Sequence, residues 1–331
     1  MNRKLSVLVG ILILGVVILL IFHSRYPFVA PAVGPWSVGF QESSNPLEEQ
    51  KLVPANIITY EYIDSLLPEP IDYIADPFFI KEKDTFYLFV EIKGSGNANI
   101  ALLTSPDGKN YDFKGTILDE AFHLSYPQVF KYKGEIYMLP ETKGSNNILL
   151  YKAEDFPYSW RISDTLVSNV GLKDPSLLLS KELNLLVAVD DDMKQYLFTA
   201  DSLTGDWKEI ENSRKAWGNE TRPGGRFFKL ENTWYLPVQN MYSGYGTGIS
   251  LYQLKGHGRN LKLTRVKKGF LGPQSEIEWF NRGMHHLDIQ EIDGRFYMVY
   301  DGDRHLNNRK EWQYKRTLKH NWIDFYNYFT Q

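Results

Sequence analysis

The chain has 331 residues, with 37 lysines and arginines against 40 acidic residues. This near balance argues against a nucleic-acid-binding surface, which needs a basic excess. The chain contains no cysteine, so its fold uses no disulfide and no thiolate metal site. Its length suits one large all-β domain of about 250 residues with an additional segment.

An apolar segment opens the chain. Residues 5–22 are apolar apart from Ser6 and two glycines, which reaches the lower length limit of a membrane-spanning helix. Arg3 and Lys4 precede it, so the positive-inside rule leaves the N-terminus in the cytoplasm and exports the rest to the periplasm or cell exterior. A cleaved signal peptide is the alternative, but no small-residue cleavage site follows directly. We expect residues 1–25 to be an uncleaved membrane anchor.

Residues 26–70 are expected to form a linker and a ring-closing strand. The part from Pro27 to Gln50 is rich in proline, glycine and serine, which indicates a linker or a packed extended arm. Asn56–Tyr60 has the composition of a strand. Such a strand could complete the last unit of a ring, so that no sheet edge stays open.

From residue 71 to the end, one pattern occurs five times. Each copy has a short β-branched or aromatic run, a polar turn and a second run, which predicts two strands joined by a tight turn. Four copies open at a proline, which lacks the N–H that a ladder needs and suits only the start of a strand. The prolines are Pro77, Pro127, Pro175 and Pro223, at steps of 50, 48 and 48 residues. The fifth copy opens at His285.

Further strand-like runs lie between the copies, and they match from one unit to the next. They cover residues 99–104, 147–151, 195–199 and 248–253. A fixed period of this size with four short strands per unit is typical of a β-propeller. We therefore predict an all-β fold, a five-bladed β-propeller over residues 71–331 preceded by one N-terminal transmembrane helix.

The residues that open the five copies are the candidate site. The first strand of each propeller blade lines the central channel, so these residues should meet at one mouth. They are Asp76, Tyr126, Asp174, Arg222 with Glu220 close before it, and His285 with His286. Burial alone would not select carboxylates, an arginine and histidines for one funnel. Adjacent strand residues point to opposite faces, so only one of the two histidines should face the channel.

Several of these residues have alternative roles. Arg222 could bind a carboxylate or phosphate of a substrate, or it could pair with Glu220 or Asp174. Tyr126 is expected to be a wall or a stacking platform. Glu141 is a rival acid that could contact sugar, although Glu91 holds the equivalent position one unit earlier and a repeated glutamate favours a structural role.

Two further motifs are expected to be loops. Asp301-Gly302-Asp303 has the pattern of a metal-binding Asp-x-Asp motif, but it directly follows a strand and is expected to be a turn. The glycine-rich segment 244–248 lies between two predicted strands and should form a flexible rim.

The Asp-Pro openings and their spacing resemble the five-bladed propellers of glycoside hydrolase families 43, 62, 32 and 68. This resemblance implies that Asp76 is the base or nucleophile, that Asp174 tunes a pKa or steadies the transition state, and that Glu220 is the general acid. Two carboxylates across a sugar are what glycoside hydrolysis requires. The resemblance also implies a histidine at the channel axis, where calcium is possible; His286 is a possible metal ligand.

The chain more closely resembles the N-terminal propeller of glucosamine inositolphosphorylceramide transferases. The matching motifs are Ile74–Phe78, Ser125–Val129, Met138–Glu141, Lys173–Pro175, Arg222–Gly225 and Met284–Asp288. In that family a separate glycosyltransferase domain follows the propeller, and the resemblance covers the propeller alone. It therefore implies a glycan or glycolipid context and a possible glycosyltransferase partner, without implying transferase activity.

These observations favour a membrane-anchored, glycan-processing propeller that acts on a surface polysaccharide or glycolipid as a glycoside hydrolase or transglycosidase. The alternatives are a non-catalytic carbohydrate-binding propeller that positions a glycan for a partner glycosyltransferase, and a scaffold that binds proteins through its rim. An enzyme should hold Asp76 and Glu220 across about 5–10 Å of open funnel. A binding protein could instead hold one of them in a salt bridge away from the mouth.

Overall fold

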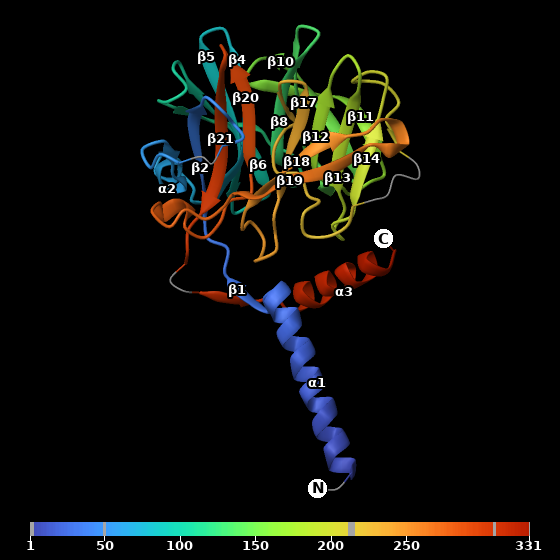
Figure 1. The fold of residues 1–331 in the computed structure, drawn as a ribbon. Coiled ribbons are helices and arrows are strands. Elements are labelled where there is room, and N and C mark those ends of the chain that lie inside the picture. The colour runs from blue at the N-terminus through green and yellow to red at the C-terminus, as the bar shows by residue number, and fades with distance from the viewer. Residues whose placement is uncertain (1–2, 49–50, 211–215, 307–308, 331) are drawn as a thin grey trace.

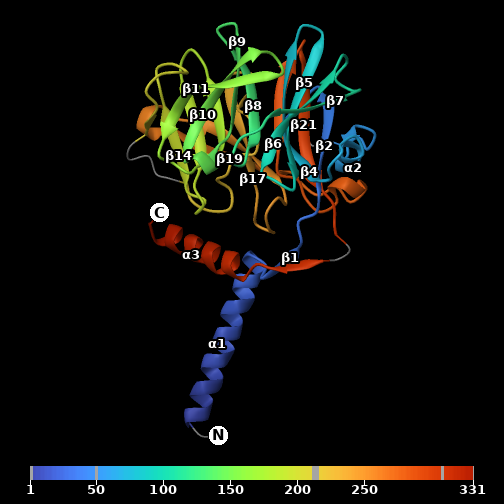
Figure 2. The same cartoon turned by 180° about the vertical axis from the view of Figure 1, so that it is seen from behind.

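Five four-stranded antiparallel sheets form a ring above a long N-terminal helix, as the sequence predicts (Figures 1 and 2). The computed structural model describes residues 3–48, 51–210, 216–306 and 309–330. Blade 1 contains β4 (Ile71–Glu82), β5 (Thr85–Gly94), β6 (Ala98–Ser105) and β7 (Asp112–Leu118). Blade 2 contains β8 (Ser125–Tyr132), β9 (Glu135–Glu141), β10 (Asn147–Asp155) and β11 (Ser159–Ser168).

The next two blades repeat this order from the inner to the outer strand. Blade 3 contains β12 (Lys173–Leu179), β13 (Asn184–Val189), β14 (Gln195–Thr199) and β15 (Lys208–Glu209). Blade 4 contains β16 (Phe228–Leu230), β17 (Thr233–Gln239), β18 (Ile249–Lys255) and β19 (Lys262–Leu271). The short helices η1 (Lys143–Ser145), η2 (Gly258–Asn260) and η3 (Glu278–Phe280) lie in connections.

Blade 5 is built from both ends of the chain. Its inner strands are β20 (Leu287–Ile292) and β21 (Arg295–Asp303), and its outer strands are β2 (Trp36–Ser43) and β3 (Ile57–Ile58). Strand β3 lies within the expected ring-closing segment, but the longer closing strand β2 lies where the sequence indicated a linker or an extended arm. Six consecutive residues of β2 are buried, and Trp36, Val38 and Phe40 alternate with smaller or polar residues, but the proline, glycine and serine content of the surrounding segment favoured a linker.

Two-residue turns join the first two strands in four blades. In each of these turns the first residue has φ near +50°. These residues are Lys83, Lys133, Glu231 and Asp293. Positive φ at this position is what the primed hairpin turns require, and these turns match the twist of the flanking strands. The polar breaks in the sequence pattern are therefore the hairpin tips.

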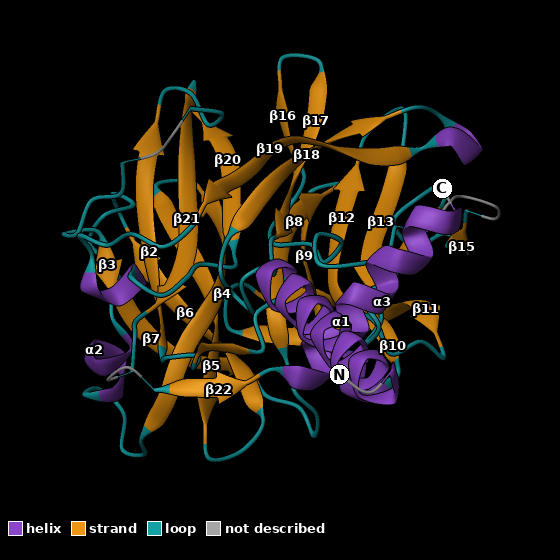
Figure 3. Cartoon of the chain, turned by 60° about the horizontal axis from the view of Figure 1, so that its bottom comes forward, coloured by secondary structure: helices purple, strands orange, loops and turns teal. Residues whose placement is uncertain are grey.

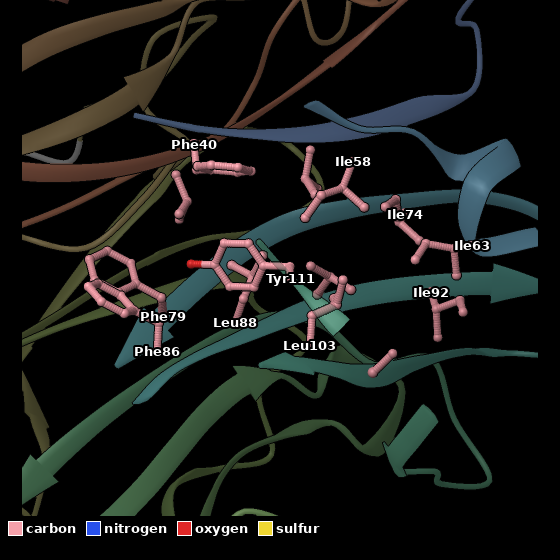
Figure 4. Packing of buried hydrophobic residues seen from close by; sticks show 14 of the residues in the cluster. Phe40, Ile58, Ile63, Ile74, Phe79, Phe86, Leu88, Ile92, Leu103 and Tyr111 are labelled. Carbon is pink, nitrogen blue, oxygen red and sulfur yellow. The ribbon is translucent and has the colours of Figure 1, made fainter. Parts of the chain in front are cut away.

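The hydrophobic core lies between neighbouring blades. Figure 4 shows the cluster between blades 5 and 1, where Phe40 and Ile58 face Phe79, Leu88 and other residues of the first blade. Side chains also tie the inner strands together around the ring. The Asp288 carboxylate on β20 accepts the N–H of Phe79 on β4 and pairs with Arg226. These links hold five separate sheets as one ring and fix where the inner strands begin.

The terminal segments lie below the ring. Helix α1 (Arg3–Arg25) is apolar and exposed all round, and its length and composition are compatible with a single-pass membrane anchor. Strand β1 (Val29–Pro31) pairs with β22 (Lys310–Trp312), and helix α3 (Tyr314–Thr330) follows and lies across the end of α1 (Figures 1 and 3). Helix α2 (Tyr60–Asp64) packs beside blade 1.

Candidate active site

Three inner strands open with the same backbone distortion. Asp76, Tyr126 and Asp174 each precede a proline and have φ of 50°, 52° and 47°. The ladder to the second strand is interrupted at each of these positions. A non-glycine residue in the left-handed region costs about 1 kcal/mol or more, so the surrounding structure must enforce it. The distortion turns these side chains out of their own sheets and toward residues of other blades.

Asp174 is the anchored carboxylate of the site. Its two oxygens accept bonds from Arg222 Nε at 2.5 Å and Arg222 Nη2 at 3.1 Å, and Gln239 donates to it at 2.8 Å. Burial favours the protonated form, but the charge and hydrogen bonds of Arg222 outweigh it and hold the pKa of Asp174 below its ordinary value. Asp174 is therefore ionised at neutral pH, and Arg222 pairs with it as one of the sequence alternatives proposed.

Asp301 is a second ionised carboxylate, which the sequence marked only as part of an Asp-x-Asp motif and did not assign to the site. It lies within β21, where a turn was expected, and it is fully buried. Its oxygens accept the backbone N–H groups of Asp76, His285 and His286 at 2.9–3.1 Å. Burial raises the pKa of Asp301, but the neighbouring His285 and these hydrogen bonds lower it below the ordinary value. Burial alone would lower the pKa of His285. The charge and hydrogen bond of Asp301 outweigh this effect and raise the pKa of the imidazole.

Three further carboxyl groups next to these anions have raised pKa values. Burial, with the charges of Asp174 and Asp301, raises the pKa of Asp76 to about 7 despite His285. Burial and the charge of Asp174 raise the pKa of Glu141 to about 8, and Glu141 Oε2 accepts the N–H of Asp174 at 3.2 Å. Burial and the charge of Asp76 also raise the pKa of Glu91. The mouth thus combines ionised and protonated acids from blades 1, 2, 3 and 5.

Hairpin register explains why Glu91 and Glu141 belong to this cluster. Each second strand runs back to the mouth, so Glu91 lies opposite Ala75 and Glu141 lies opposite Ser125. Both glutamates therefore end beside the distorted opening residue of their own blade. The sequence showed their equivalence and favoured a structural role. The register of the predicted hairpins could have placed them at the mouth instead.

The two histidines precede β20 and have different surroundings, although Nδ1 of His286 also lies 3.6 Å from Asp76. His285 Nδ1 lies 2.8 Å from Asp301 and 3.8 Å from Asp76, so His285 faces the acid cluster. His286 lies edge-on between the rings of Phe78 and Tyr126, and burial lowers its pKa to about 3. It is a neutral residue of the inner wall.

Tyr126 lies in the same wall beneath the mouth. The side chain is fully buried, and its hydroxyl contacts Ser176 Oγ and the backbone of Gly225 at 2.6–2.7 Å. Tyr126 therefore links blade 2 to blades 3 and 4 and offers no exposed ring face. It fits a wall better than a stacking platform.

Glu220 makes its contacts outside the acid cluster. It lies in the segment before β16, accepts from Ser250 Oγ at 2.6 Å and Tyr252 Oη at 3.2 Å, and pairs with Arg265. These partners belong to β18 and β19. The segment before β16 is irregular, so strand alternation gave no direction for this side chain.

Two aromatic residues cover the cluster. Tyr245, from the expected rim loop, lies with its ring centroid 5.6 Å from the Arg222 guanidinium and 5.2 Å from the His285 ring. Trp36, at the start of β2, stacks on His285 with centroids 3.8 Å apart. Sequence reasoning missed Trp36, because its segment had been taken as a linker or arm.

Asp76, His285 and Asp301 are the described residues that could hold a metal ion. One ligand atom from each lies within 4.8 Å of the others. Calcium takes six to eight oxygen ligands. Asp301 already accepts three backbone N–H groups, and an imidazole with two carboxylates better matches a transition metal. The residues therefore fit calcium poorly, and the chemistry below uses none.

The fold is shared with solved structures of five-bladed propellers. A putative glycoside hydrolase from Bacteroides ovatus matches with a TM-score of 0.57 and 13% identity, over 82% of this chain and 97% of that chain. An α-L-arabinofuranosidase from Clostridium thermocellum matches with a TM-score of 0.52 and 15% identity, over 68% of this chain and 81% of that chain. At these identities the likeness concerns the fold alone.

Within this class, the family model of the N-terminal region of glucosamine inositolphosphorylceramide transferase 1 matches residues 21–303, so the chain belongs to that family. A relative of that name from Oryza sativa subsp. japonica is 31% identical over an alignment of 308 residues, and the alignment covers 82% of this chain. The match covers 40% of the rice protein, so the chain spans about two fifths of its length. The family resemblance seen in the sequence is confirmed.

Proposed function

We propose that the propeller cleaves or transfers a glycosidic bond at the acid cluster. The observation that carries this proposal is the separation of the pKa values: Asp76 at about 7 and Glu141 at about 8, next to an ionised Asp174. Carboxyl groups whose environments differ in this way can act as acid and base at the same pH. The relatives named in the comparisons act on a glycolipid by their printed name, which supports a glycan substrate.

The roles follow from the protonation states. Glu141, protonated at neutral pH, donates its proton to the leaving glycosidic oxygen. Asp76 in its ionised form takes a proton from the water, or the sugar hydroxyl, that attacks the anomeric carbon. Asp174, held by Arg222, orients the sugar and stabilises positive charge at the ring. Glu141 replaces Glu220 as the proton donor, because the contacts of Glu220 lie on β18 and β19.

The test is a glycan panel assayed with the full-length protein and its Asp76→Asn variant. Asparagine keeps the shape of the side chain and removes the base, so turnover should fall by roughly 100-fold or more while glycan affinity changes little. Lys181→Ala, at an exposed hairpin tip, is the matched control and should keep full activity. Full activity in Asp76→Asn would disprove this assignment.

A non-catalytic glycan-binding propeller is the second candidate. Two observations favour it: Glu220 pairs with Arg265 outside the acid cluster, as expected of a binding protein, and the acids are little exposed, with Asp76 at 6% and Glu141 at 7%. Its relatives are also named as transferases and extend well beyond the matched region, so a partner glycosyltransferase could use the bound glycan. Glycan binding without turnover in the wild-type protein, unchanged in Asp76→Asn, would establish this candidate.

We further propose that α1 spans the membrane with the propeller on the periplasmic or extracellular side. The supporting observations are the exposed apolar surface of α1 and the basic residues Arg3 and Lys4 before it. Because the chain lacks cysteine, a single Glu182→Cys variant reports the side directly. A membrane-impermeant maleimide should label it in intact cells, and labelling only after lysis would reverse the orientation.

A further inference from the structure

Helix α3 carries an apolar stripe on its exposed side. Its members recur at spacings of four, four, three and four residues, so they share one helical face. They are between 48% and 68% exposed: Tyr314, Leu318, Trp322, Phe325 and Phe329. Neighbouring rings in this set contact each other, as in the stack of Trp322 on Phe325 and the contact of Phe325 with Phe329. This stripe, named the α3 stripe below, is unusual for a surface in water.

The opposite face of α3 is buried and, apart from Ile323, mostly polar. Thr317 Oγ1 donates to the carbonyl of Pro27, and Asn321 and His320 are at most 6% exposed. Asp324 accepts bonds from Arg25 at 2.6 Å and from the Tyr26 hydroxyl at 2.5 Å. The helix is therefore fixed with its polar side toward the protein and its apolar side outward, the reverse of a helix that packs on a core in water.

The position of α3 identifies what the stripe faces. The contacts of Asp324 and of Asn321 lie at the C-terminal end of α1, at Phe22, Arg25 and Tyr26. Figures 1 and 3 show α3 lying across this end of α1. A cavity of about 1370 Å³ lies between the end of α1, α3 and the propeller, and its lining includes Phe22, Arg25, members of the α3 stripe and propeller residues such as Glu220 and Tyr252. The stripe thus borders the space around the point where α1 would leave the membrane.

We infer that α3 is an interfacial membrane helix whose stripe inserts at the boundary between lipid headgroups and acyl chains. The inference rests on the proposed membrane span of α1. Tryptophan and tyrosine prefer this boundary, and an amphipathic helix with an aromatic face lies within it. Exposed Lys315 beside the stripe can reach the headgroup phosphates. The family match covers residues 21–303, and α3 lies outside that range.

This surface also orients the mouth. Tyr26, after the end of α1, stacks on Tyr242 with centroids 5.7 Å apart. Tyr242 belongs to the loop that carries Tyr245 over Arg222. The loop above the acid cluster is therefore tied to the end of α1. With α1 across the bilayer and α3 on its surface, the mouth faces the lipid.

Depth-dependent quenching tests the inference in the full-length protein. Since the chain has no cysteine, Trp322→Cys and Phe325→Cys can each carry one environment-sensitive fluorophore. The protein is reconstituted in phosphatidylcholine vesicles that contain nitroxide lipids with the nitroxide at a shallow acyl position. Both labels should be quenched several-fold more than a label at Glu182→Cys on an exposed hairpin tip. A label at Leu12→Cys, within α1, reports the span itself and should respond to deep nitroxides.

The outcomes separate this inference from the other proposals. If Leu12→Cys is quenched and the α3 labels behave like the Glu182→Cys control, the inference is wrong and the span stands. If none is quenched, the span and the inference both fail. If the α3 labels are shielded without quenching and the protein is dimeric in nanodiscs, a second copy covers the stripe and the inference is wrong. Glycan turnover enters none of these readouts, and thermal unfolding midpoints equal to wild type confirm that the variants fold.

Discussion

Asp174, Asp76 and Glu141 all carry a carboxyl group at the mouth. Their pKa values differ because their neighbouring residues differ. Asp174 has Arg222 in a two-point ion pair, and its pKa is lowered. Asp76 is 3.8 Å from His285, which Asp301 already engages at 2.8 Å, and its pKa is raised. Glu141 lies 3.9 Å from Arg222, too far to compete with Asp174. The distribution of two cations among the acids thus sets which acid has a lowered pKa and which has a raised pKa.

The first prediction concerns the pH dependence of turnover. The base Asp76 must be ionised and the acid Glu141 must be protonated, so activity needs a pH above about 7 for one and below about 8 for the other. We expect a narrow bell-shaped profile of kcat/KM with limbs near these values. Glu141→Gln should lower the maximum and remove the alkaline limb. A wild-type profile that still rises well above pH 8 would contradict the assignment of Glu141.

The second prediction concerns the pH dependence of stability. A carboxyl group whose pKa is raised on folding costs nothing below its unfolded pKa and destabilises the fold progressively as pH rises to its folded pKa. For Glu141 this window runs from the ordinary pKa of 4.5 to about 8. Each unit is worth about 1.4 kcal/mol, so the cost reaches several kcal/mol. We expect Glu141→Gln to raise Tm at alkaline pH and to leave it nearly unchanged at about pH 5.

Asp174→Asn is the opposite case and the control for this measurement. Its pKa is lowered, so its stabilisation is present above the ordinary pKa of 3.8 and is lost as pH falls through the folded value. The asparagine variant leaves Arg222 buried without its partner and should lower Tm at neutral and alkaline pH by several degrees. A Tm difference for Glu141→Gln that stays the same at every pH would show that its burial does not shift its pKa.

At the scale of single elements, the strand openings explain which parts of the site the sequence revealed. The prolines marked where the inner strands begin, and regular spacing placed Asp76 and Asp174 at one mouth. The left-handed backbone at these positions, which directs the side chains, has no sequence signal because residues before proline ordinarily avoid helical conformations. Blade 4 opens through the irregular segment 222–227, so the repeat placed Arg222 at the cluster but could not direct Glu220.

The third prediction tests that irregular opening. Gly225 has φ of 152°, and a Cβ there would lie 1.8 Å from the carbonyl oxygen of Leu287. Its own carbonyl accepts from Tyr126 and Ser176. We expect Gly225→Ala to destabilise the protein by roughly 2–5 kcal/mol, from backbone strain and overpacking. Chemical denaturation measures this loss.

Gly96→Ala is the matched control for this substitution. Nothing lies within 4 Å of the position where its Cβ would be. Its unfolding free energy should stay within about 0.5 kcal/mol of wild type. Equal stability of both alanine variants would mean that the inner strands of blades 4 and 5 do not approach as closely as the structure shows.

At the scale of the whole molecule, the ring was predictable from the repeat. The sheet of a single repeat cannot bury both of its faces alone, so each sheet must pack between two neighbouring sheets. The fixed period gave the number of blades, and a closing strand was required because an open edge is costly. The strand that mainly closes the ring, β2, escaped prediction because its segment is rich in proline, glycine and serine, which outweighed the alternation of Trp36, Val38 and Phe40. Trp36, which stacks on His285, was missed for the same reason. Residues far apart in sequence meet at the mouth, so the pKa pattern of the acids lies beyond sequence reasoning.

The last prediction tests ring closure by truncation. A chain that begins at Val29 lacks α1 and keeps β2, which pairs with β21 along eight residues from Trp36 opposite Asp303 to Ser43 opposite Phe296. A chain that begins at Ser44 lacks β2, so β21 would have an open edge and the cluster around Val38 and Phe40 would be exposed. We expect the first chain to be monomeric with one cooperative unfolding transition. The second chain should elute as aggregates in size-exclusion chromatography, since four blades and half of a fifth do not form a closed ring.

If both chains are equally soluble and unfold at the same Tm, the N-terminal strand does not hold the ring together, and the placement of Trp36 over the acid cluster loses its structural basis.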